Sequence, residues 1–380
     1  MTLHAKLFDT RREDFSYVVE KFDNTRKRGL NCGKQRGLGM GNIFPQRTTL
    51  KESPLLIEES LRLIEKSFHY KKPFSFKEDF APLMDPSNHH NCFIYTDENN
   101  KVIAHIGMKD RTLRVNGNEH SLCLLGGIAV DEERRGEGLF RSLMEDVISE
   151  KRSDCAFFLL WSDQEKLYKK FGFTLCGPQY EYPKSEGKGN FEKTKFSSLT
   201  PQDRGAIQFL FEKSFAQNAL TPARTKEDWD LISKTESADL FIKRENGRPI
   251  AYFFMNKGQD LTGIIYEYGF QGDIKDFVEE AKTYGTLWSP FPLADLNTQQ
   301  FQFMLAPADR RLFAAFIRDY TGGKFELRDI NLIKGEAFFD FEDETLGLEI
   351  PEFLRGVLGP GSFEELGNVS PLFISGLDSI

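Results

Sequence analysis

The sequence Leu124-Leu125-Gly126-Gly127-Ile128-Ala129-Val130 runs directly into Asp131-Glu132-Glu133-Arg134-Arg135-Gly136-Glu137-Gly138. The first part is an apolar run short enough for a buried strand, and the second is a polar turn with arginines and glycines. Beyond the turn, apolar residues recur at a spacing that places them on one face of a helix. They are Leu139, Phe140, Leu143, Met144, Val147 and Ile148. The stretch therefore predicts a strand, a glycine loop and a helix.

The start of this helix is a predicted anion site. Its first backbone N–H groups have no partners within the helix, and the positive end of the helix dipole points toward the loop. Gly136 and Gly138 remove side chains that would keep a phosphate from these amides, and the preceding arginines add positive charge. Glu137 has the wrong charge for such a site, so we expect it to pair with Arg134 or Arg141.

A second motif follows one strand candidate later. After the apolar segment 156–161 comes Tyr168-Lys169-Lys170-Phe171-Gly172-Phe173. Together the two motifs resemble the GNAT superfamily of acetyl-CoA-dependent acyltransferases, in which a phosphate loop Arg/Gln-x-x-Gly-x-Gly/Ala precedes a Tyr-x-x-Phe/Leu-Gly-Phe segment. The loop at 135–140 departs from that pattern at its last position, Phe140. In this respect it resembles the enhanced-intracellular-survival branch, whose chains have similar length and a second GNAT-like domain.

The resemblance implies an α/β fold with a mixed sheet, two GNAT-like domains in tandem and a C-terminal extension. Residues 1–50 are predicted to form an N-terminal extension with a helix and a Gly-rich basic loop, and residues 51–190 the catalytic domain. The order of elements repeats over 191–300, but its loop at 269–273 has no arginine, so we interpret this copy as degenerate and unable to bind the cofactor. Residues 301–380 are predicted to be an α/β segment whose tail docks toward the first domain.

A rival to the phosphate loop occurs near the N-terminus. Arg36-Gly37-Leu38-Gly39-Met40-Gly41 fits the family formula better than 135–140 does. No apolar strand precedes it, however, and Pro45 follows where a helix would be needed. We interpret this segment as a mobile or substrate-facing loop, with anion binding as the alternative.

The resemblance assigns acetyl-CoA binding to the end of the strand and to the loop. Backbone groups of the strand residues would hold the pantetheine arm and offer a donor to the thioester oxygen. The residues assigned to acetyl-CoA are Ile128, Ala129, Val130, Arg134, Arg135, Gly136, Glu137, Gly138, Leu139 and Phe140.

Two residues are candidates for catalysis. Tyr168 matches the GNAT tyrosine near the leaving sulfur and is the candidate general acid; the alternative is an aromatic side chain packed beside Phe171 and Phe173. Many GNAT enzymes carry a glutamate that acts as the general base where this chain has Leu124. No carboxylate side chain occurs between residues 123 and 130 of this chain. In the enhanced-intracellular-survival branch the base is the C-terminal carboxylate, which here belongs to Ile380. The alternative is that Leu377 and Ile380 close a hydrophobic edge.

Composition limits the class of protein. The chain has 380 residues and a formal net charge of -8, which argues against a nucleic-acid or anionic-membrane surface and is compatible with a small-molecule or peptide amine as acceptor. No apolar run approaches the length of a membrane span, and the polar N-terminus does not read as a signal peptide, so the cytoplasm is expected. The five cysteines and the histidines lack ligand spacing, and no metal is predicted. A homo-oligomer is compatible with the sequence.

Two other functions stay open. The missing glutamate also fits a non-catalytic acyl-CoA-binding or regulatory protein with a GNAT-like fold. Phe140 and the 36 phenylalanines could instead line a pocket for a longer acyl donor, although core packing also explains them.

Overall fold

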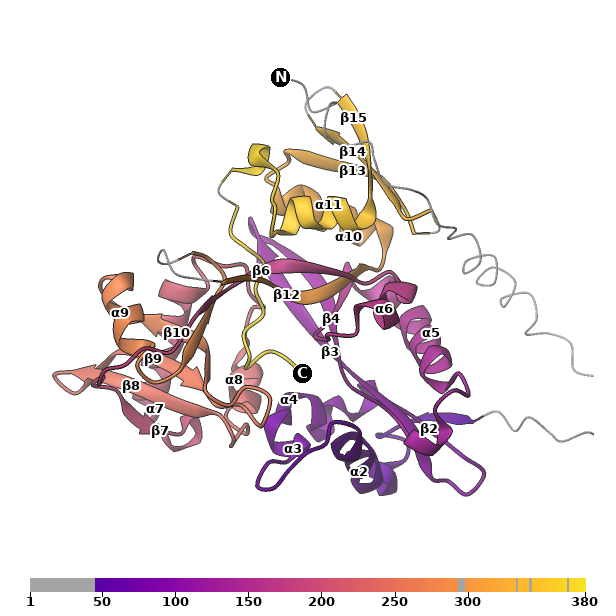
Figure 1. Cartoon of the computed structure of the whole chain (residues 1–380), viewed down its shortest axis with the longest axis horizontal. Coiled ribbons are helices and arrows are strands. Elements are labelled where there is room, and N and C mark those ends of the chain that lie inside the picture. Colours follow the sequence, from indigo (N-terminus) through magenta and orange to yellow (C-terminus); the bar gives the residue numbers. More distant parts are fainter. Residues whose placement is uncertain (1–44, 293–297, 333, 342–343, 368) are drawn as a thin grey trace, which may run out of the picture.

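The protein is a mixed α/β structure with a large sheet that runs through its whole width (Figure 1). The computed structural model describes residues 45–292, 298–332, 334–341, 344–367 and 369–380. The helix expected at 12–22 and the Gly-rich loop at 29–41 lie outside the described residues.

The first half contains the predicted strand, loop and helix in the predicted order. Its elements are β1 (Gln46–Thr49), α2 (Ile57–Ser67), α3 (Phe76–Asp79), α4 (Ala81–Met84), β2 (Cys92–Thr96), β3 (Val102–Val115), β4 (Asn118–Val130), α5 (Leu139–Lys151), β5 (Phe157–Leu160), α6 (Glu165–Tyr168) and β6 (Thr174–Tyr182). The apolar face of α5 is buried as its spacing predicts, with Leu143, Met144 and Val147 packed on the sheet.

The second half repeats much of this order. Its elements are β7 (Glu192–Thr194), α7 (Pro201–Leu210), α8 (Lys226–Ile232), β8 (Asp239–Glu245), β9 (Arg248–Met255), β10 (Ile264–Phe270), α9 (Ile274–Ala281), β11 (Thr286–Ser289) and β12 (Thr298–Pro307). Helix α7 starts after Thr200, because the Thr200 hydroxyl accepts a hydrogen bond from the Asp203 N–H and Pro201 occupies the first turn.

The C-terminal segment forms a separate layer, orange to yellow in Figure 1. It consists of α10 (Arg310–Tyr320), a three-stranded sheet of β13 (Phe325–Asn331), β14 (Glu336–Phe341) and β15 (Glu344–Glu349), and α11 (Ile350–Leu358). The sequence predicted an α/β segment here, but it did not indicate β15 or a sheet separate from the main one.

The strands of the large sheet follow each other in chain order inward from each edge, β1 to β5 from one edge and β7 to β11 from the other. The full order is β1-β2-β3-β4-β5-β12-β6-β11-β10-β9-β8-β7, and β4 pairs with β5, and β10 with β11, in parallel. Strand β12 lies between β5 and β6, although more than 100 residues separate it from either in sequence. The expected boundary at 300 falls inside β12, so the two halves share strands of one sheet.

The tail after α11 returns to the middle of the molecule (Figure 1). Phe373 donates its N–H to the Leu220 carbonyl, and the Leu220 N–H donates to the Pro371 carbonyl. Farther along, Gln302 exchanges two hydrogen bonds with the backbone of Ile374. The expectation that this apolar end is tied down is confirmed, since Leu377 and Ile380 are buried.

Candidate functional site

The strands β4 and β5 separate at the predicted cofactor strand. They pair in parallel through three residue pairs, the last being Leu124 with Leu159. Strand β5 then ends at Leu160, whereas β4 continues to Val130. Among the described residues, no strand pairs with that side of β4 beyond Leu124, so its backbone N–H and C=O groups are available to a ligand.

A bulge interrupts β4 at this separation. The pairing with β3 shifts between His105 opposite Ala129 and Gly107 opposite Gly126, which places an extra residue in β4. Gly127 takes a positive φ of 59°, and its carbonyl accepts a hydrogen bond of 2.7 Å from Nδ1 of His105. Such a bulge turns the neighbouring backbone groups away from the ladder. Burial lowers the pKa of His105 to about 4, so the imidazole that holds the bulge is neutral.

The glycine loop leaves the start of α5 open. Gly136 and Gly138 have φ of 88° and 82°, and a Cβ on either would meet no atom of the described residues within 4 Å. Helix α5 has Gly138 as N-cap, no side-chain cap from the described part of the chain and no acidic residue in its first turn. These are the conditions under which a helix start binds a phosphate.

The charges around the loop are arranged for an anion. Arg134 donates from Nε to Oε1 of Glu137 at 2.8 Å, which confirms the expected pairing and lowers the pKa of Glu137. Arg135 lies 3.8 Å from Glu132, and more than half of its side chain is exposed. Arg135 is therefore the more exposed and more weakly paired of the two arginines.

The matching helix of the second half starts differently. The Asp273 carboxylate caps α9 by accepting from the N–H groups of Lys275 and Asp276. Gly269, before this helix, packs so closely that a Cβ there would lie 2.8 Å from the Leu210 backbone. The negative charge of Asp273 at the start of α9 opposes pyrophosphate binding.

Tyr168 lies at the end of α6, beside the loop. Its ring packs edge-on against Phe140 and Phe173, with centroids 5.7 Å and 6.1 Å away. Burial raises the pKa of Tyr168 to about 12, and a hydrogen bond with Ser162 opposes this rise. The residue is thus both a packed aromatic and a protonated phenol at neutral pH.

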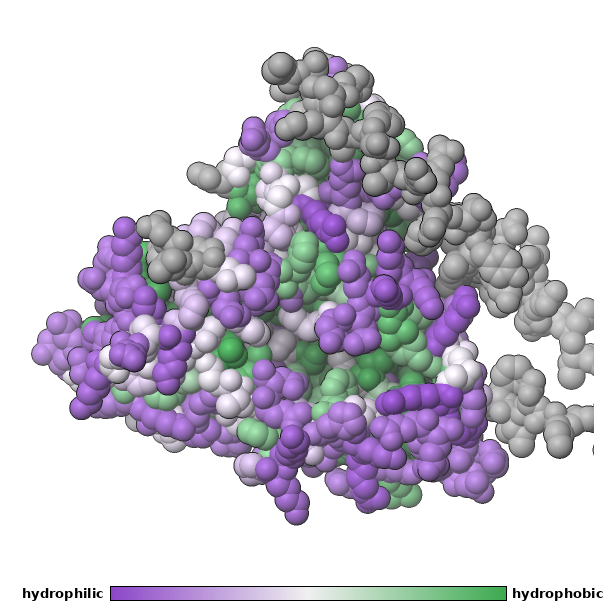
Figure 2. Space-filling model, in the orientation of Figure 1, coloured by the Kyte–Doolittle hydropathy of each residue, from purple (hydrophilic) through white to green (hydrophobic). Residues whose placement is uncertain are grey.

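The C-terminal residue lies directly on β4. A Cβ built on Gly126 would be 2.5 Å from both the carboxyl carbon and an oxygen of Ile380. Figure 2 shows a hollowed area with apolar side chains in the middle of this face, around the place where Figure 1 draws the C-terminus. The fold thus brings Ile380 against the strand that carries Leu124.

A comparison with protein families matches the part of the chain that runs from the end of β1 into β6. Residues 49–176 match the family model described as an acetyltransferase (GNAT) domain. The chain carries a GNAT domain.

Solved structures with the GNAT fold extend the likeness over most of the chain. A GCN5-related N-acetyltransferase from Kribbella flavida is 13% identical with a TM-score of 0.54, over 90% of this chain and 100% of that one. A GCN5-related N-acetyltransferase from Anabaena variabilis is also 13% identical with a TM-score of 0.54, over 88% of this chain and 100% of that one. Eis1 from Mycobacterium abscessus is 11% identical with a TM-score of 0.52, over 83% of this chain and 91% of that one. No curated protein matches the chain. At these identities the likeness shows the fold.

Sequence reasoning missed the group that anchors the tail to the second half. Arg224 is almost fully buried and donates to Asp378, Glu267 and the Ser375 hydroxyl, with its Nη2 2.7 Å from Oδ2 of Asp378. The two carboxylates raise the pKa of Arg224 despite its burial. Asp378 lies 154 residues from Arg224, so no local pattern in the sequence indicated this contact.

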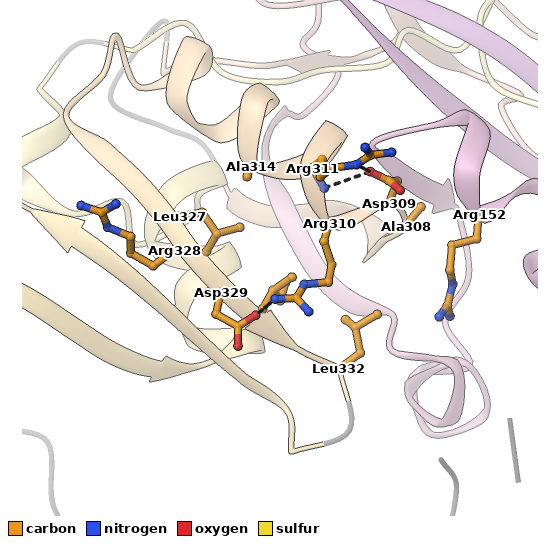
Figure 3. A pocket seen from close by; sticks show the side chains of 11 residues that line it. Arg152, Ala308, Asp309, Arg310, Arg311, Ala314, Leu327, Arg328, Asp329 and Leu332 are labelled. Carbon is orange, nitrogen blue, oxygen red and sulfur yellow. Dashed lines mark hydrogen bonds and ion pairs between the residues drawn. The ribbon is translucent and has the colours of Figure 1, made fainter. Parts of the chain in front are cut away.

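A cavity of about 530 Å³ lies away from the GNAT loop, between α10, β13 and Arg152 after α5 (Figure 3). Arginines line it, but Arg310 pairs with Asp329 and Arg328 with Asp340. None of the predicted site residues borders this cavity. Its arginines are partly neutralised, and we do not assign the cofactor to it.

His89 and four of the cysteines lie in the interior of the described structure. His89 bonds through Nε2 with the Met84 carbonyl, and four cysteines are buried and free: Cys92, Cys123, Cys155 and Cys176. The described residues contain no group of three side chains suited to a metal. Of the helices in the described ranges, none has the length and apolarity to cross a membrane.

Proposed function

We propose that this protein is an acetyl-CoA-dependent N-acetyltransferase, in which an amine attacks acetyl-CoA directly in a ternary complex. The observation that carries this proposal is the Ile380 carboxyl group lying on the backbone of β4 at Gly126. A base is what the GNAT strand otherwise lacks, and the folded tail supplies a carboxylate at that strand. The acceptor class is a small-molecule amine or a peptide amine.

The donor would lie along the open side of β4. In this proposal the start of α5 and Arg135 bind the pyrophosphate, and the backbone of Ile128, Ala129 and Val130 holds the pantetheine arm. The bulge at Gly127 aims a backbone N–H at the thioester oxygen, where negative charge develops in the transition state. The remaining loop residues, Arg134, Gly136, Glu137, Gly138, Leu139 and Phe140, complete the proposed site.

The proposed chemistry needs one base and one acid. The amine nitrogen attacks the thioester carbon and passes its proton to the Ile380 carboxylate, and the C–S bond breaks. Tyr168, protonated at neutral pH, gives its proton to the departing thiolate. The Ile380 carboxyl group then releases its proton to solvent and the Tyr168 phenolate takes one up, which returns the site to its starting state.

The proposal also assigns roles to the domains. Residues 51–190 would bind acetyl-CoA, and residues 191–300 would form a second GNAT-like domain without cofactor that supports the tail. The capped start of α9 supports this division, because Asp273 already occupies the amides that a pyrophosphate would use.

The donor site is tested by a thermal shift assay with acetyl-CoA. Arg135→Ala combined with Gly138→Asp should abolish the shift, because the second change places a carboxylate at the start of α5. Gly272→Asp is the matched control: Gly272 also has a positive φ, 103°, and open space, but it precedes α9. A shift that survives the double change, or that disappears equally in the control, would refute the site.

A second candidate is a non-catalytic acyl-CoA-binding protein with the same fold. The observation that favours it is that β4 itself carries no carboxylate near Leu124. The release of free thiol from acetyl-CoA in the presence of a panel of amines separates the two, because binding alone releases none. The same assay with donors of increasing acyl length tests the third alternative, a longer acyl donor. The packing of Phe140 on Tyr168 and Phe171 argues against this alternative, because the ring already has partners within the fold.

A further inference from the structure

We propose that Lys257 is a positioning residue that fixes the last turn of the tail and thereby holds the Ile380 carboxylate at β4. This inference rests on the proposed function, in which that carboxylate is the base. Lys257 lies in the turn after β9, in the half of the chain that lacks the cofactor loop.

The contacts of Lys257 within hydrogen-bond distance are concentrated on the tail. Lys257 is 2% exposed, and its Nζ donates to the carbonyl oxygens of Gly376 and Ser379 at 2.6 Å and 2.7 Å. The third contact, at 3.1 Å, is to the Ser379 hydroxyl. An ammonium has three protons, so all of them have acceptors in the last five residues of the chain.

These contacts close a turn that ends next to the carboxylate. The N–H groups of Asp378 and Ser379 both donate to the Ser375 carbonyl, so residues 375–379 form one compact turn. Lys257 joins the two ends of that turn through Gly376 and Ser379. Since Ser379 precedes Ile380, holding its carbonyl leaves few torsions through which the terminal carboxylate can move.

Lys257 also joins the two halves of the molecule at this point. Its Nζ lies 4.4 Å from the centroid of the Phe80 ring, which belongs to the first half. The next residue, Gly258, packs on Asp79 of α3 so closely that a Cβ there would overlap its carboxylate. The turn that carries Lys257 is therefore wedged against the half of the chain that carries β4.

Charged groups of both signs surround Lys257 and shift its pKa in opposite directions. Burial lowers the pKa of Lys257 to about 7, while the carboxylates of Asp378, Asp79 and Asp260 raise it and Arg111 lowers it further. Arg224 is a poorer subject for a test, since its removal would leave two carboxylates buried without their partner.

The first test is kinetic and uses the whole chain with acetyl-CoA and an amine that gives turnover. Lys257→Met keeps most of the side-chain volume and removes the donors. We expect kcat to fall about 100-fold, the cost of a small misplacement of a reacting group, with the acetyl-CoA thermal shift unchanged. Lys243→Met is the matched control, because Lys243 pairs with Glu280 and not with the tail.

A double-mutant cycle separates positioning from general support. In a chain that lacks Ile380, Lys257→Met should reduce kcat no further, because the group that it positions is already displaced. Lys257→Arg keeps a charge and donors and should recover part of the turnover. The inference would be overturned if Lys257→Met lowered kcat by the same factor with and without Ile380. It would also be overturned if Lys257→Met weakened acetyl-CoA binding as much as it lowered kcat.

A measurement without turnover distinguishes this inference from the proposed function. After brief treatment with a carboxypeptidase, mass spectrometry should find Ile380 retained in the wild type and in Lys243→Met, and released from Lys257→Met. If no amine gives turnover but this difference appears, the proposed function fails and the fixing of the tail stands. If Ile380 is released equally from all three chains, the inference about Lys257 fails.

Discussion

At the scale of single residues, Tyr168 combines two roles that the sequence presented as alternatives. It packs between Phe140 and Phe173, and its burial keeps the phenol protonated. We predict that Tyr168→Phe lowers kcat by about 100-fold or more, the usual share of a general acid, and leaves the acetyl-CoA thermal shift unchanged. Tyr180→Phe, which removes a hydroxyl bonded to Gln299, is the control. Equal turnover in both variants would exclude Tyr168 as the acid.

His105 gives a prediction about pH. Its pKa is lowered from an ordinary 6.5 to about 4, so between these values the unfolded chain binds the proton that the folded chain does not. Its contribution to stability is therefore complete above pH 6.5 and is lost as the pH falls toward 4. His105→Gln can still donate to Gly127 but does not titrate. We expect urea denaturation between pH 7 and 4.5 to show a smaller loss of stability in this variant; identical slopes would contradict the assignment.

Individual residues also show which contacts of the site could be predicted from the sequence. Gly136, Gly138 and the pairing of Glu137 with Arg134 were predictable, because their partners lie within a few positions. Arg224 and Lys257 were not, since their partners in the tail lie more than 100 residues away. The resemblance to the enhanced-intracellular-survival branch pointed to Ile380, but its position against Gly126 is seen only in the folded chain.

At the scale of elements, the starts of α5 and α9 explain why the two halves differ. One begins at an uncapped glycine in the described structure, and the other at a capping aspartate. We predict that Glu137→Gln tightens acetyl-CoA binding by about two- to fivefold at low salt, because it removes a negative charge near the start of α5 and releases Arg134. Isothermal titration at low and high salt measures this, and Glu279→Gln on α9 is the control. Weaker binding would mean that Glu137 has another role at the loop.

At the scale of the whole molecule, the exchange of strands makes the halves depend on each other. Strand β12 fills the space between β5 and β6, so a chain cut at residue 190 would leave both strands with an unpaired edge. We predict one cooperative unfolding transition for the whole chain, and aggregation of residues 45–190 alone that co-expression with 191–380 relieves. A soluble fragment with its own sharp transition would contradict this.

The same exchange marks the limit of sequence reasoning about the fold. The order of helices, strands and loop was predictable from periodicity and from the two motifs. Which strand borders β5 was not, because β6 and β12 are both apolar strands that could fill the position. The neighbour is chosen by packing across the whole sheet, which local patterns do not encode.

The central claim is that the carboxylate of Ile380 acts as the base at β4. The most direct measurement is kcat for a semisynthetic chain that ends in the Ile380 amide, which removes the charge and leaves the tail contacts of Asp378 and Ser379 in place. The account predicts that kcat falls by about 100-fold or more while acetyl-CoA protects both chains equally against thermal unfolding. Turnover equal to that of the natural carboxylate would contradict it.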